Sequence, residues 1–396
     1  MSGHRVVVTG IGVITANANT TAEYADALRA GRSGIRGLTL FDPGFPFRQA
    51  GQVDVPGEDG SEGRRTDRVS RLAVIAADQA VDDAGLERGG EALARAGLCV
   101  GTSRGPAQSL ERLLVPCDGG AALWLMREVP FYSIARNVAR HLGLSGPSST
   151  VTMACVSSSL AIGRAMDAIR RGRTRVMLAG GADSLTTLSF SGFSVLRAMT
   201  RTTCRPFDRN RDGMVLGEGA GVLVLEELEH ARARGARIYA ELLGWGTAGD
   251  AHHATSPHPE GRGLAAALTA ALRDARTAPE AIDHANLHGT GTPANDPAEC
   301  HAVRRVFGEH CARLPVNSLK PMIGHTLGAA GVLELAGSLL AMMNGFIPPT
   351  INSSEPDPRC DLDVVTGTAR DCRVRTLVST KSAFGGANVA IVARAV

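Results

Sequence analysis

Short apolar runs alternate along the chain with longer stretches in which apolar residues recur every three to four positions. The short runs predict strands, and the longer stretches predict helices. Strands are expected at residues 6–8, 98–101, 175–178, 221–226, 238–243, 284–287 and 389–392. Helices are expected at residues 71–84, 158–171, 227–234, 263–275 and 328–343. Alternation of this kind is typical of an α/β protein.

Glycines mark several of the predicted boundaries. Gly85 and Gly172 follow two predicted helices, at the position where a left-handed residue commonly closes the last turn. Gly180 and Gly181 follow the predicted strand at 175–178 and are expected to form a turn. The Pro- and Gly-rich stretches 41–63 and 252–263 are expected to be surface loops or lids.

The second half of the chain loosely repeats the order of the first. Each half has a strand, then a turn with a reactive residue, then a helix rich in small residues. That reactive residue is Cys155 in the first half and His325 in the second. A chain of 396 residues also exceeds the usual size of a single core. We therefore expect two duplicated halves, an N-terminal one at 1–237 that carries the cysteine and a C-terminal one at 238–396 that carries two histidines.

Composition and charge exclude several classes of function. A hydrophobic content of 44%, a charged content of 20% and a net charge of +3 describe an ordinary globular protein without a basic nucleic-acid surface. Neither a signal peptide nor a membrane-spanning apolar run is apparent, so a cytoplasmic protein is expected. The eight cysteines should then be mostly reduced, and none shows the C-x-x-C spacing of a structural metal site.

Lysine is rare in this chain. Lys320 and Lys381 are the only lysines among its 42 basic residues. Replacement of lysine by arginine is unremarkable where only charge matters, but an ammonium and a guanidinium differ in shape and chemistry. Both lysines lie in Gly-rich segments, which makes them candidates for a specific role.

Three segments carry residues that could do chemistry. Cys155 lies between a β-prone run and a predicted helix, where helix N–H groups would favour the thiolate and could hold an oxyanion. His288 follows a short strand on a turn with two glycines and two threonines, and His325 precedes an apolar helix that carries Glu334. A buried glutamate would need Lys320, Lys381 or a bound cation as its partner. Taken singly, each segment also has an ordinary structural explanation: a small buried thiol, a histidine satisfied in a turn, or a capping histidine beside an exposed lysine.

A fourth segment, at 380–388, places two glycines after Phe384 and could point an N–H group into a cavity, although an ordinary turn explains it as well. Together, one cysteine and two histidines on separate turns suggest catalysis by a thiolate nucleophile. Residue chemistry alone leaves a thiol hydrolase and an acyltransferase open. Two imidazole N–H donors aimed at one oxygen would suit an enolate or a carbonyl oxyanion.

The four segments, in this order, resemble the β-ketoacyl-[acyl-carrier-protein] synthases, close to the type II elongating enzymes of fatty acid and polyketide synthesis. The resemblance rests on the following stretches: Ala154-Cys155, Arg205-Pro206-Phe207-Asp208, Gly217-Glu218-Gly219-Ala220-Gly221, His288-Gly289-Thr290-Gly291-Thr292, Lys320, Gly324-His325 and Pro348-Pro349-Thr350-Ile351-Asn352. It implies a thiolase-like α/β fold, with two duplicated halves in α-β-α-β-α layers. It also implies a dimer, either with a second copy or with a chain-length-factor-like subunit.

The same resemblance implies the chemistry. Cys155 would take the acyl group from the phosphopantetheine of an acyl carrier protein, and His288 and His325 would stabilise the enolate formed when malonyl carrier protein loses CO₂. Lys320 would tune the electrostatics around His325. The remaining implied roles are a second oxyanion donor and gate at Phe384, pantetheine contacts at Thr290 and Thr292, structural residues at Asn286, Glu334 and Lys381, and carrier-protein docking at Arg64 and Arg65. No metal or separate cofactor is expected.

The chain departs from the family pattern in two places. Relatives carry Asn-Ser-Phe-Gly-Phe-Gly-Gly where this chain has residues 380–386, with Ser382 in place of an aromatic residue. We hypothesise that the Lys381 ammonium stands beside Glu334 where some relatives bind a monovalent cation. Relatives also place small or aliphatic residues at the floor of the acyl pocket, where this chain has Ser103 and Arg104.

An arginine at that floor is costly to bury without a partner. Either the pocket takes a polar or conjugated acyl chain, or Arg104 turns to an acid of a partner subunit. This departure favours polyketide or polyene assembly over the housekeeping elongation of fatty acids. A non-catalytic chain-length partner subunit is the alternative from another class, but such subunits lack the nucleophile that Cys155 supplies here.

Overall fold

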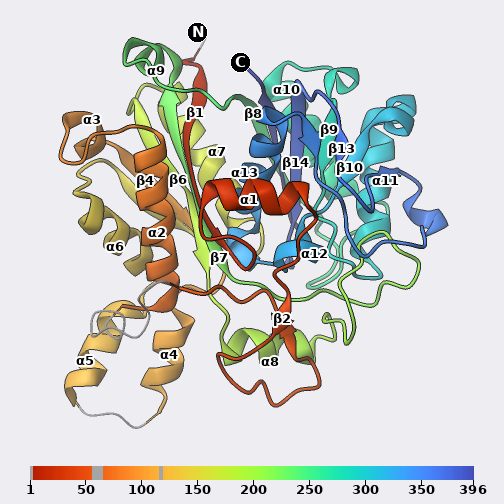
Figure 1. Cartoon of the computed structure of the whole chain (residues 1–396), viewed down its shortest axis with the longest axis horizontal. Helices are drawn as coiled ribbons and strands as arrows, with labels where there is room; N and C mark the ends of the chain where they lie inside the picture. Colours follow the sequence, from red (N-terminus) through yellow and green to blue (C-terminus); the bar gives the residue numbers. More distant parts are fainter. Residues whose placement is uncertain (1–2, 56–65, 116–118) are drawn as a thin grey trace.

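A single large mixed sheet forms the centre of the computed structural model, which describes residues 3–55, 66–115 and 119–396 (Figure 1). Within these ranges the sheet has eleven strands in the order β12-β10-β9-β14-β15-β8-β1-β7-β6-β4-β5. The strands of the first half are β1 (Val6–Thr15), β4 (Gly97–Gly101), β5 (Ser148–Val151), β6 (Val176–Asp183) and β7 (Gly219–Glu227). Those of the second half are β8 (Ala240–Gly249), β9 (His284–Asn286), β10 (Pro315–Asn317), β14 (Thr376–Ser382) and β15 (Ala387–Arg394), with β12 (Asp363–Val364) at the edge.

The two halves of the sheet have the same topology. In the first, β1 and β7 are antiparallel, as are β7 and β6, while β6, β4 and β5 are parallel. In the second, β8, β15, β14, β9 and β10 repeat the same order and the same directions. The halves meet where β1 pairs antiparallel with β8 over three residues. The duplicated, thiolase-like fold expected from the sequence is confirmed.

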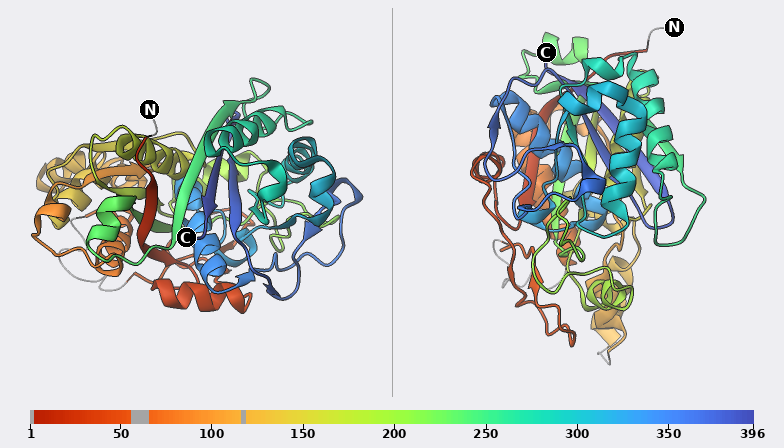
Figure 2. Two further views of the ribbon diagram at one scale, coloured as in Figure 1. Left: turned by 90° about the horizontal axis from the view of Figure 1, so that it is seen from above. Right: turned by 90° about the vertical axis from the view of Figure 1, so that its right-hand side faces the viewer.

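Helices form three layers around the two halves of the sheet: a central layer that contacts both halves, and one outer layer on each half. The central layer is formed by α7 (Ser157–Arg170) and α13 (Ala330–Met343), which pack on each other and on strands of both halves. One outer layer contains α2 (Arg68–Asp83) and α6 (Ser133–Leu142) over the first half. The other contains α10 (Arg262–Ala275) and α11 (Asn295–Phe307) over the second half. Figure 2 shows these outer helices on the flanks of the molecule.

Shorter elements complete the described chain. The helices are α1 (Thr21–Arg29), α3 (Glu91–Ala94), α4 (Ala107–Leu113), α5 (Gly119–Glu128), α8 (Thr187–Val195), α9 (Leu228–Ala233) and α12 (Lys320–Ile323). The strands are β2 (Arg36–Gly37), β3 (Gln49–Ala50), β11 (Phe346–Ile347) and β13 (Arg370–Asp371). The helices α4, α5 and α8 project from the lower edge of the sheet in Figure 1.

Small residues allow the two central helices to approach closely. A Cβ atom at Gly331 of α13 would overlap the Ser159 hydroxyl of α7. The Ser158 hydroxyl instead accepts a hydrogen bond from the backbone N–H of Val332, at 3.0 Å. Since Cys155 precedes α7 and His325 precedes α13, this contact fixes the distance between the two reactive turns.

The expected elements are all present, but one predicted turn is wrong. Gly180 and Gly181 lie inside β6 and pair with β7 and β4 on either side. They are glycine because the strands and α7 leave no space: a Cβ at Gly181 would overlap the carbonyl oxygen of Gly101 and the side chain of Ser158. Most expected strands are also shorter than those observed, as at β1 and β8.

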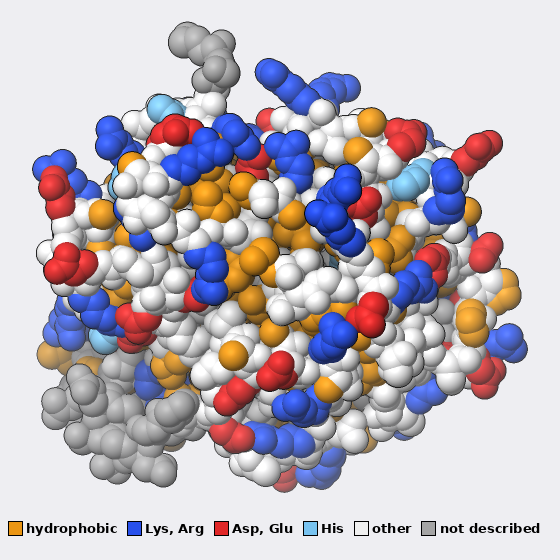
Figure 3. Space-filling model, turned by 45° about the horizontal axis from the view of Figure 1, so that its top comes forward, with side chains coloured by type: hydrophobic (Ala, Val, Ile, Leu, Met, Phe, Trp, Pro, Cys, Tyr) orange, Lys and Arg blue, Asp and Glu red, His pale blue; other side chains and the backbone are white. Residues whose placement is uncertain are grey.

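The surface and the cysteines agree with the compositional analysis. On the face shown in Figure 3, basic and acidic side chains are interspersed. The seven cysteines of the described ranges are free thiols. Within the same ranges no group of side chains is arranged to hold a metal ion, and no helix is long and apolar enough to cross a membrane. Of the two stretches expected to be loops or lids, 252–263 lies mainly between β8 and α10, whereas the described part of the other, 41–55, contains the short strand β3, and 56–63 lie outside the described residues.

Candidate active site

Cys155 lies in a tight turn between β5 and α7. The turn is held by Ser157, whose hydroxyl accepts from the Met153 N–H at 2.8 Å and donates to the Ala154 carbonyl at 2.6 Å. Ala154 has a φ of 45°, a left-handed conformation that costs free energy outside glycine. The turn therefore aims a nearly buried sulfur at the space between the halves.

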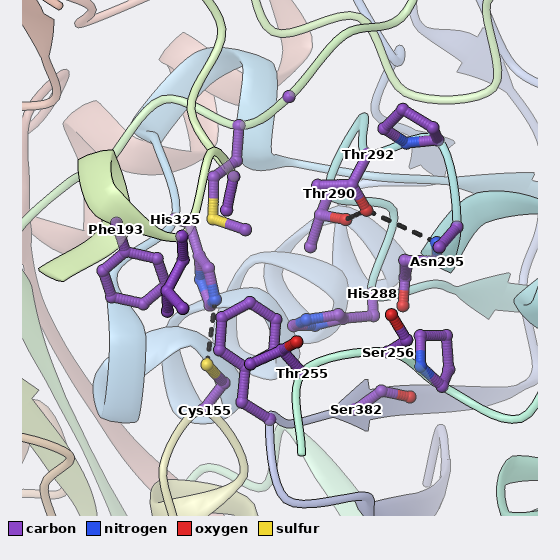
Figure 4. A pocket seen from close by; sticks show the side chains of 18 of the residues that line it. Cys155, Phe193, Thr255, Ser256, His288, Thr290, Thr292, Asn295, His325 and Ser382 are labelled. Carbon is purple, nitrogen blue, oxygen red and sulfur yellow. Dashed lines mark hydrogen bonds between the residues drawn. The ribbon is translucent and has the colours of Figure 1, made fainter. Parts of the chain in front are cut away.

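His325 reaches that sulfur from the other half of the molecule. Its Nε2 atom lies 3.0 Å from Sγ of Cys155 (Figure 4). Its backbone N–H donates to the Val215 carbonyl at 2.7 Å, which anchors the turn before α13. Gly324, with φ 75°, passes so close to Leu216 and Gly217 that a side chain could not fit there.

His288 follows β9 and lies beside His325. The two ring centroids are 5.2 Å apart, and the ring planes meet at 84°. A buried carboxylate holds the backbone of this turn: Glu299 accepts from the N–H of His288 at 2.6 Å and from that of Gly289 at 2.8 Å. Both imidazole rings are thereby fixed within reach of one point above Cys155.

The three side chains open onto one cavity of about 210 Å³. In Figure 4 the cysteine, the two histidines and Phe193 surround its inner end, while Thr290 and Thr292 lie further along it. The threonine hydroxyls contact each other at 2.9 Å. Further lining residues are Arg197, Met214, Thr255, Ser256, Asn295, Ser382 and Phe384. The cavity is thus mainly apolar at its inner end and carries hydroxyls along one wall.

Burial sets the charge state of the reactive groups. It raises the pKa of the Cys155 thiol to about 12, although the positive charges of Lys320 and Arg104 act in the opposite direction. It lowers the pKa of His288 and of His325 well below the usual value, and the nearby lysines lower both further. The thiolate expected at the helix N-terminus does not hold for this site, because desolvation outweighs the opposing charges of Lys320 and Arg104. The pair is a neutral thiol against a neutral imidazole.

The two lysines meet at one glutamate. Lys320 Nζ lies 2.6 Å from Oε1 of Glu334, and Lys381 Nζ lies 2.9 Å from Oε2. All three side chains are buried. Lys320 also donates to the His288 carbonyl at 2.5 Å, and Lys381 donates to Oδ1 of Asn286 at 2.9 Å. The cluster carries a net charge of about +1 beneath the two histidines.

Four other predicted site residues do not lie in the described lining of the cavity. Ser103 and Arg104 do not line the cavity; the loop that carries them is held by Asp183, which accepts from their N–H groups at 2.7 and 3.0 Å. Arg104 instead extends over the ring of Phe193. The proposed docking residues Arg64 and Arg65 lie outside the described residues.

Sequence reasoning missed two buried carboxylates that support the site. Asp183 also accepts from the N–H of Gly328, so it joins the loop after β4 to the turn after His325. Burial raises its pKa to about 6. Glu299, described above, fixes the turn at His288. The available signal was an acid in an otherwise apolar or small-residue stretch, as at Asp183 directly after Gly180-Gly181-Ala182.

A thiol, two neutral imidazoles and a buried ammonium at the junction of two thiolase-like halves are suited to acyl transfer through a cysteine nucleophile. Comparison with known proteins agrees. The N-terminal domain of beta-ketoacyl synthase matches residues 3–231, and the C-terminal domain of that family matches residues 239–354. The chain belongs to the beta-ketoacyl synthase family, and it is therefore an acyltransferase.

Relatives from two pathways are about equally similar. The ketoacyl synthase alpha subunit of the tetracenomycin polyketide synthase of Streptomyces glaucescens is 41% identical, over 98% of this chain and 97% of its own. A 3-oxoacyl-[acyl-carrier-protein] synthase 2 of Coxiella burnetii is 39% identical, over 99% of both chains. Among solved structures, the ishigamide ketosynthase/chain length factor superposes with a TM-score of 0.93 at 40% identity, covering both chains completely. The resemblance stated from the sequence is confirmed.

Proposed function

We propose that this protein is a β-ketoacyl-acyl-carrier-protein synthase that joins a malonyl unit to an acyl group held on Cys155. The observation that carries the proposal is the 3.0 Å contact between Cys155 Sγ and His325 Nε2, with the ring of His288 against the same cavity. A thiol that is buried and protonated needs a base in contact with it, and a neutral imidazole is suited to that task.

Acyl loading is the first half of the reaction. The Cys155 sulfur attacks the thioester carbonyl of the acyl carrier protein, and its proton moves through Nε2 of His325 to the departing phosphopantetheine sulfur. The N–H groups of Cys155 and Phe384 are proposed to hold the oxyanion. The acyl group ends as a thioester on Cys155. Neutral His325 favours this step because it can accept the thiol proton and then release it.

Condensation is the second half. Malonyl carrier protein loses CO₂, and the N–H groups of His288 and His325 stabilise the enolate oxygen. The enolate carbon then attacks the acyl carbon, the bond to Cys155 breaks, and the thiolate takes up a proton. Burial, reinforced by the ammoniums of Lys320 and Lys381, lowers the pKa of both rings and keeps them neutral, which lets them serve as hydrogen-bond donors to a developing anion.

The surrounding residues receive supporting roles. Thr290 and Thr292, on the wall of the cavity, are proposed to bind the pantetheine arm, and Phe384 to gate the acyl pocket. Asn286 and Glu334 hold the two lysines, and Lys381 is proposed to stand where some relatives bind a monovalent cation. Its buried contact with Glu334 supports this role, since a cation there would meet the same carboxylate.

The partners are proposed on the same basis. The substrates arrive on the phosphopantetheine of an acyl carrier protein, without a separate cofactor, and the chain pairs with a second copy or with a chain-length-factor-like subunit. Arg64 and Arg65 remain the proposed docking residues for the acidic carrier protein, and a cytoplasmic location remains a prediction. Between the two pathways we propose polyketide or polyene assembly, because the guanidinium of Arg104 lies behind Phe193 of the cavity wall, where an apolar group would suit a saturated chain better.

Two alternatives are kept because specific observations favour them. Housekeeping elongation of fatty acids is supported by a relative nearly as similar as the polyketide enzyme. A partner subunit without condensing activity is supported by the similarity to a structure that includes a chain length factor. The contact between Cys155 and His325 argues against the second, because a subunit without chemistry has no need of it.

Intact-mass measurement after incubation with acyl carrier proteins of varied chains tests the proposal. We expect an acyl adduct on the wild-type protein and none on Cys155→Ala, whereas Cys311→Ala, which removes a thiol away from the cavity, should load normally. Product formation with malonyl carrier protein should fall by at least about 1,000-fold in Cys155→Ala. An unmodified wild-type protein with every carrier tried would refute the function.

A further inference from the structure

Arg104 lies in the loop between β4 and α4, beside the segment that carries Cys155. The pairing of β4 with β5 continues into a hydrogen bond from the Thr102 N–H to the Val151 carbonyl at 3.0 Å. The backbone of Arg104 is fixed by Asp183, at 3.0 Å. The loop is thus rigidly attached next to the nucleophile, and its geometry does not depend on the Arg104 side chain.

The side chain of Arg104 contacts the wall of the acyl cavity. Its guanidinium carbon lies 5.7 Å from the ring centroid of Phe193. The Phe193 ring in turn lies 5.7 Å from that of Phe384, tilted by 31°. Both phenylalanines line the cavity together with Cys155, whereas Arg104 does not. An acyl chain that grows from Cys155 along this wall therefore meets two aromatic rings and then a guanidinium.

One buried donor of this guanidinium is not used within the described chain. The Nε atom is buried and has no hydrogen-bond partner among the described residues, although the side chain as a whole is partly exposed. A buried donor without an acceptor is costly, and more so when it is charged. A planar fork of donors also suits an oxygen acceptor far better than a hydrocarbon chain does.

We infer that Arg104 is a specificity-determining residue, which selects acyl chains with an accepting oxygen beyond the thioester over saturated chains of equal length. The inference rests on the proposed function and names its substrate class. A keto or carboxylate oxygen on the chain supplies the acceptor that the guanidinium lacks, and Phe193 packs against the chain on the way. A saturated chain leaves the donor unpaired, as the empty site does.

The test compares rates of Cys155 acylation from octanoyl, 5-oxo-octanoyl and 7-oxo-octanoyl carrier protein, measured by intact mass on the assembled protein. We expect the wild-type protein to prefer one of the oxo chains by about tenfold or more, since a hydrogen bond to a charged group is at stake. In Arg104→Met the preference should fall to within about twofold. Loss of charge near the thiol affects all three substrates equally, so their ratio isolates the contact.

Two further variants control for fold and charge. Arg232→Met, on the exposed face of α9, removes the same charge and should keep the wild-type ratio. Arg104→Lys keeps the charge without the fork and should show an intermediate ratio, which also provides a readout if the methionine variant fails to fold.

Other outcomes overturn the inference. Equal loading of all three chains by the wild type would do so while leaving the proposed function intact. An unchanged preference in Arg104→Met would do the same, and if that variant also lost its partner subunit, the side chain would belong to the interface. No loading from any carrier protein would instead refute the proposed function, and this inference with it.

Discussion

The turns before α7 and α13 occupy equivalent places in the two halves, yet they are built from different chemistry. Each follows the third strand of its half and leads into a central helix. The turn before α7 is short, is held by serine hydroxyls and carries one thiol. The turn before α13 is longer, contains the helix α12, and brings Lys320, His325 and the buried Glu334 together.

This division brings different groups to one cavity: a buried thiol from the first half, and two histidines from the second. Burial raises the pKa of the Cys155 thiol, and the charges that act on it come from both halves: Lys320 from the second, and Asp183 and Arg104 from the first. Burial, reinforced by the lysines of the second half, lowers the pKa of both histidines and keeps them neutral. Under the proposed function, the first half supplies the thiol that forms the thioester, and the second half supplies the histidines that stabilise the enolate. The predictions below test this division, beginning with the largest expected effect.

Glu334→Gln should be the most damaging substitution in the second half. It leaves Lys320 and Lys381 buried near each other with their shared carboxylate removed. Leaving a buried charge without its partner costs about 3–5 kcal/mol. Urea unfolding should show a loss of that size. Glu229→Gln, which breaks an exposed ion pair on α9, should change the free energy of unfolding by less than about 1 kcal/mol. If the two variants lost similar free energies of unfolding, Glu334 would not be neutralising the two buried lysines.

The two histidines should differ in which half-reaction they support. His325→Ala should slow both the acylation of Cys155 and the condensation, because its ring touches the sulfur. His288→Ala should slow the condensation by about 100- to 1,000-fold, the usual effect of one lost oxyanion donor, and should leave acylation nearly unchanged. Single-turnover acylation and product formation separate the steps, with the exposed His141→Ala as control. If the two variants acylated Cys155 at equal rates, His325 would not be the base for the acylation step.

The sequence predicted most of the elements and brought the main reactive residues into one hypothesis. It singled out Cys155, His288 and His325, which line one cavity, because each lies on a turn between a strand and a helix, where local pattern is informative. It failed with Gly180 and Gly181, whose small size is required by neighbouring strands rather than by a turn. Such packing requirements arise between segments distant in the chain and have no local signal.

The role of Asp183 was hidden for the same reason. Its hydrogen-bond donors come from the loop after β4 and from the turn after His325, which the sequence separates widely. The charge state of Cys155 was predicted wrongly because a helix N-terminus is visible in a sequence, whereas the extent of burial depends on the assembled halves. The pairing of both lysines with Glu334 was one of several alternatives that only three-dimensional structure could decide.

Substitution of Lys381 should have a smaller effect on stability, and it tests whether the ammonium takes the place of a monovalent cation. In Lys381→Ser, Glu334 keeps its ion pair with Lys320, so we expect a loss of only about 1–3 kcal/mol in the free energy of unfolding. If the ammonium stands in the place of a monovalent cation, potassium chloride should restore part of that stability, and choline chloride at equal ionic strength should not. The wild-type protein should respond equally to both salts. A variant that does not distinguish the salts would leave Lys381 as a simple ion-pair partner.

The pH dependence of Cys155 alkylation tests the raised pKa of the thiol, and its expected effect is the smallest of those considered. Because burial raises the pKa of the thiol to about 12, the thiolate is a minor species throughout the neutral range. Below its pKa the thiolate fraction rises about tenfold for each pH unit, so iodoacetamide alkylation of the unliganded protein should rise steadily from pH 7 to pH 9. A thiol with a lowered pKa would instead reach a plateau within this range. Intact mass, with Cys155→Ala as the blank, follows the reaction; a plateau below pH 8 would mean that the helix N-terminus outweighs burial.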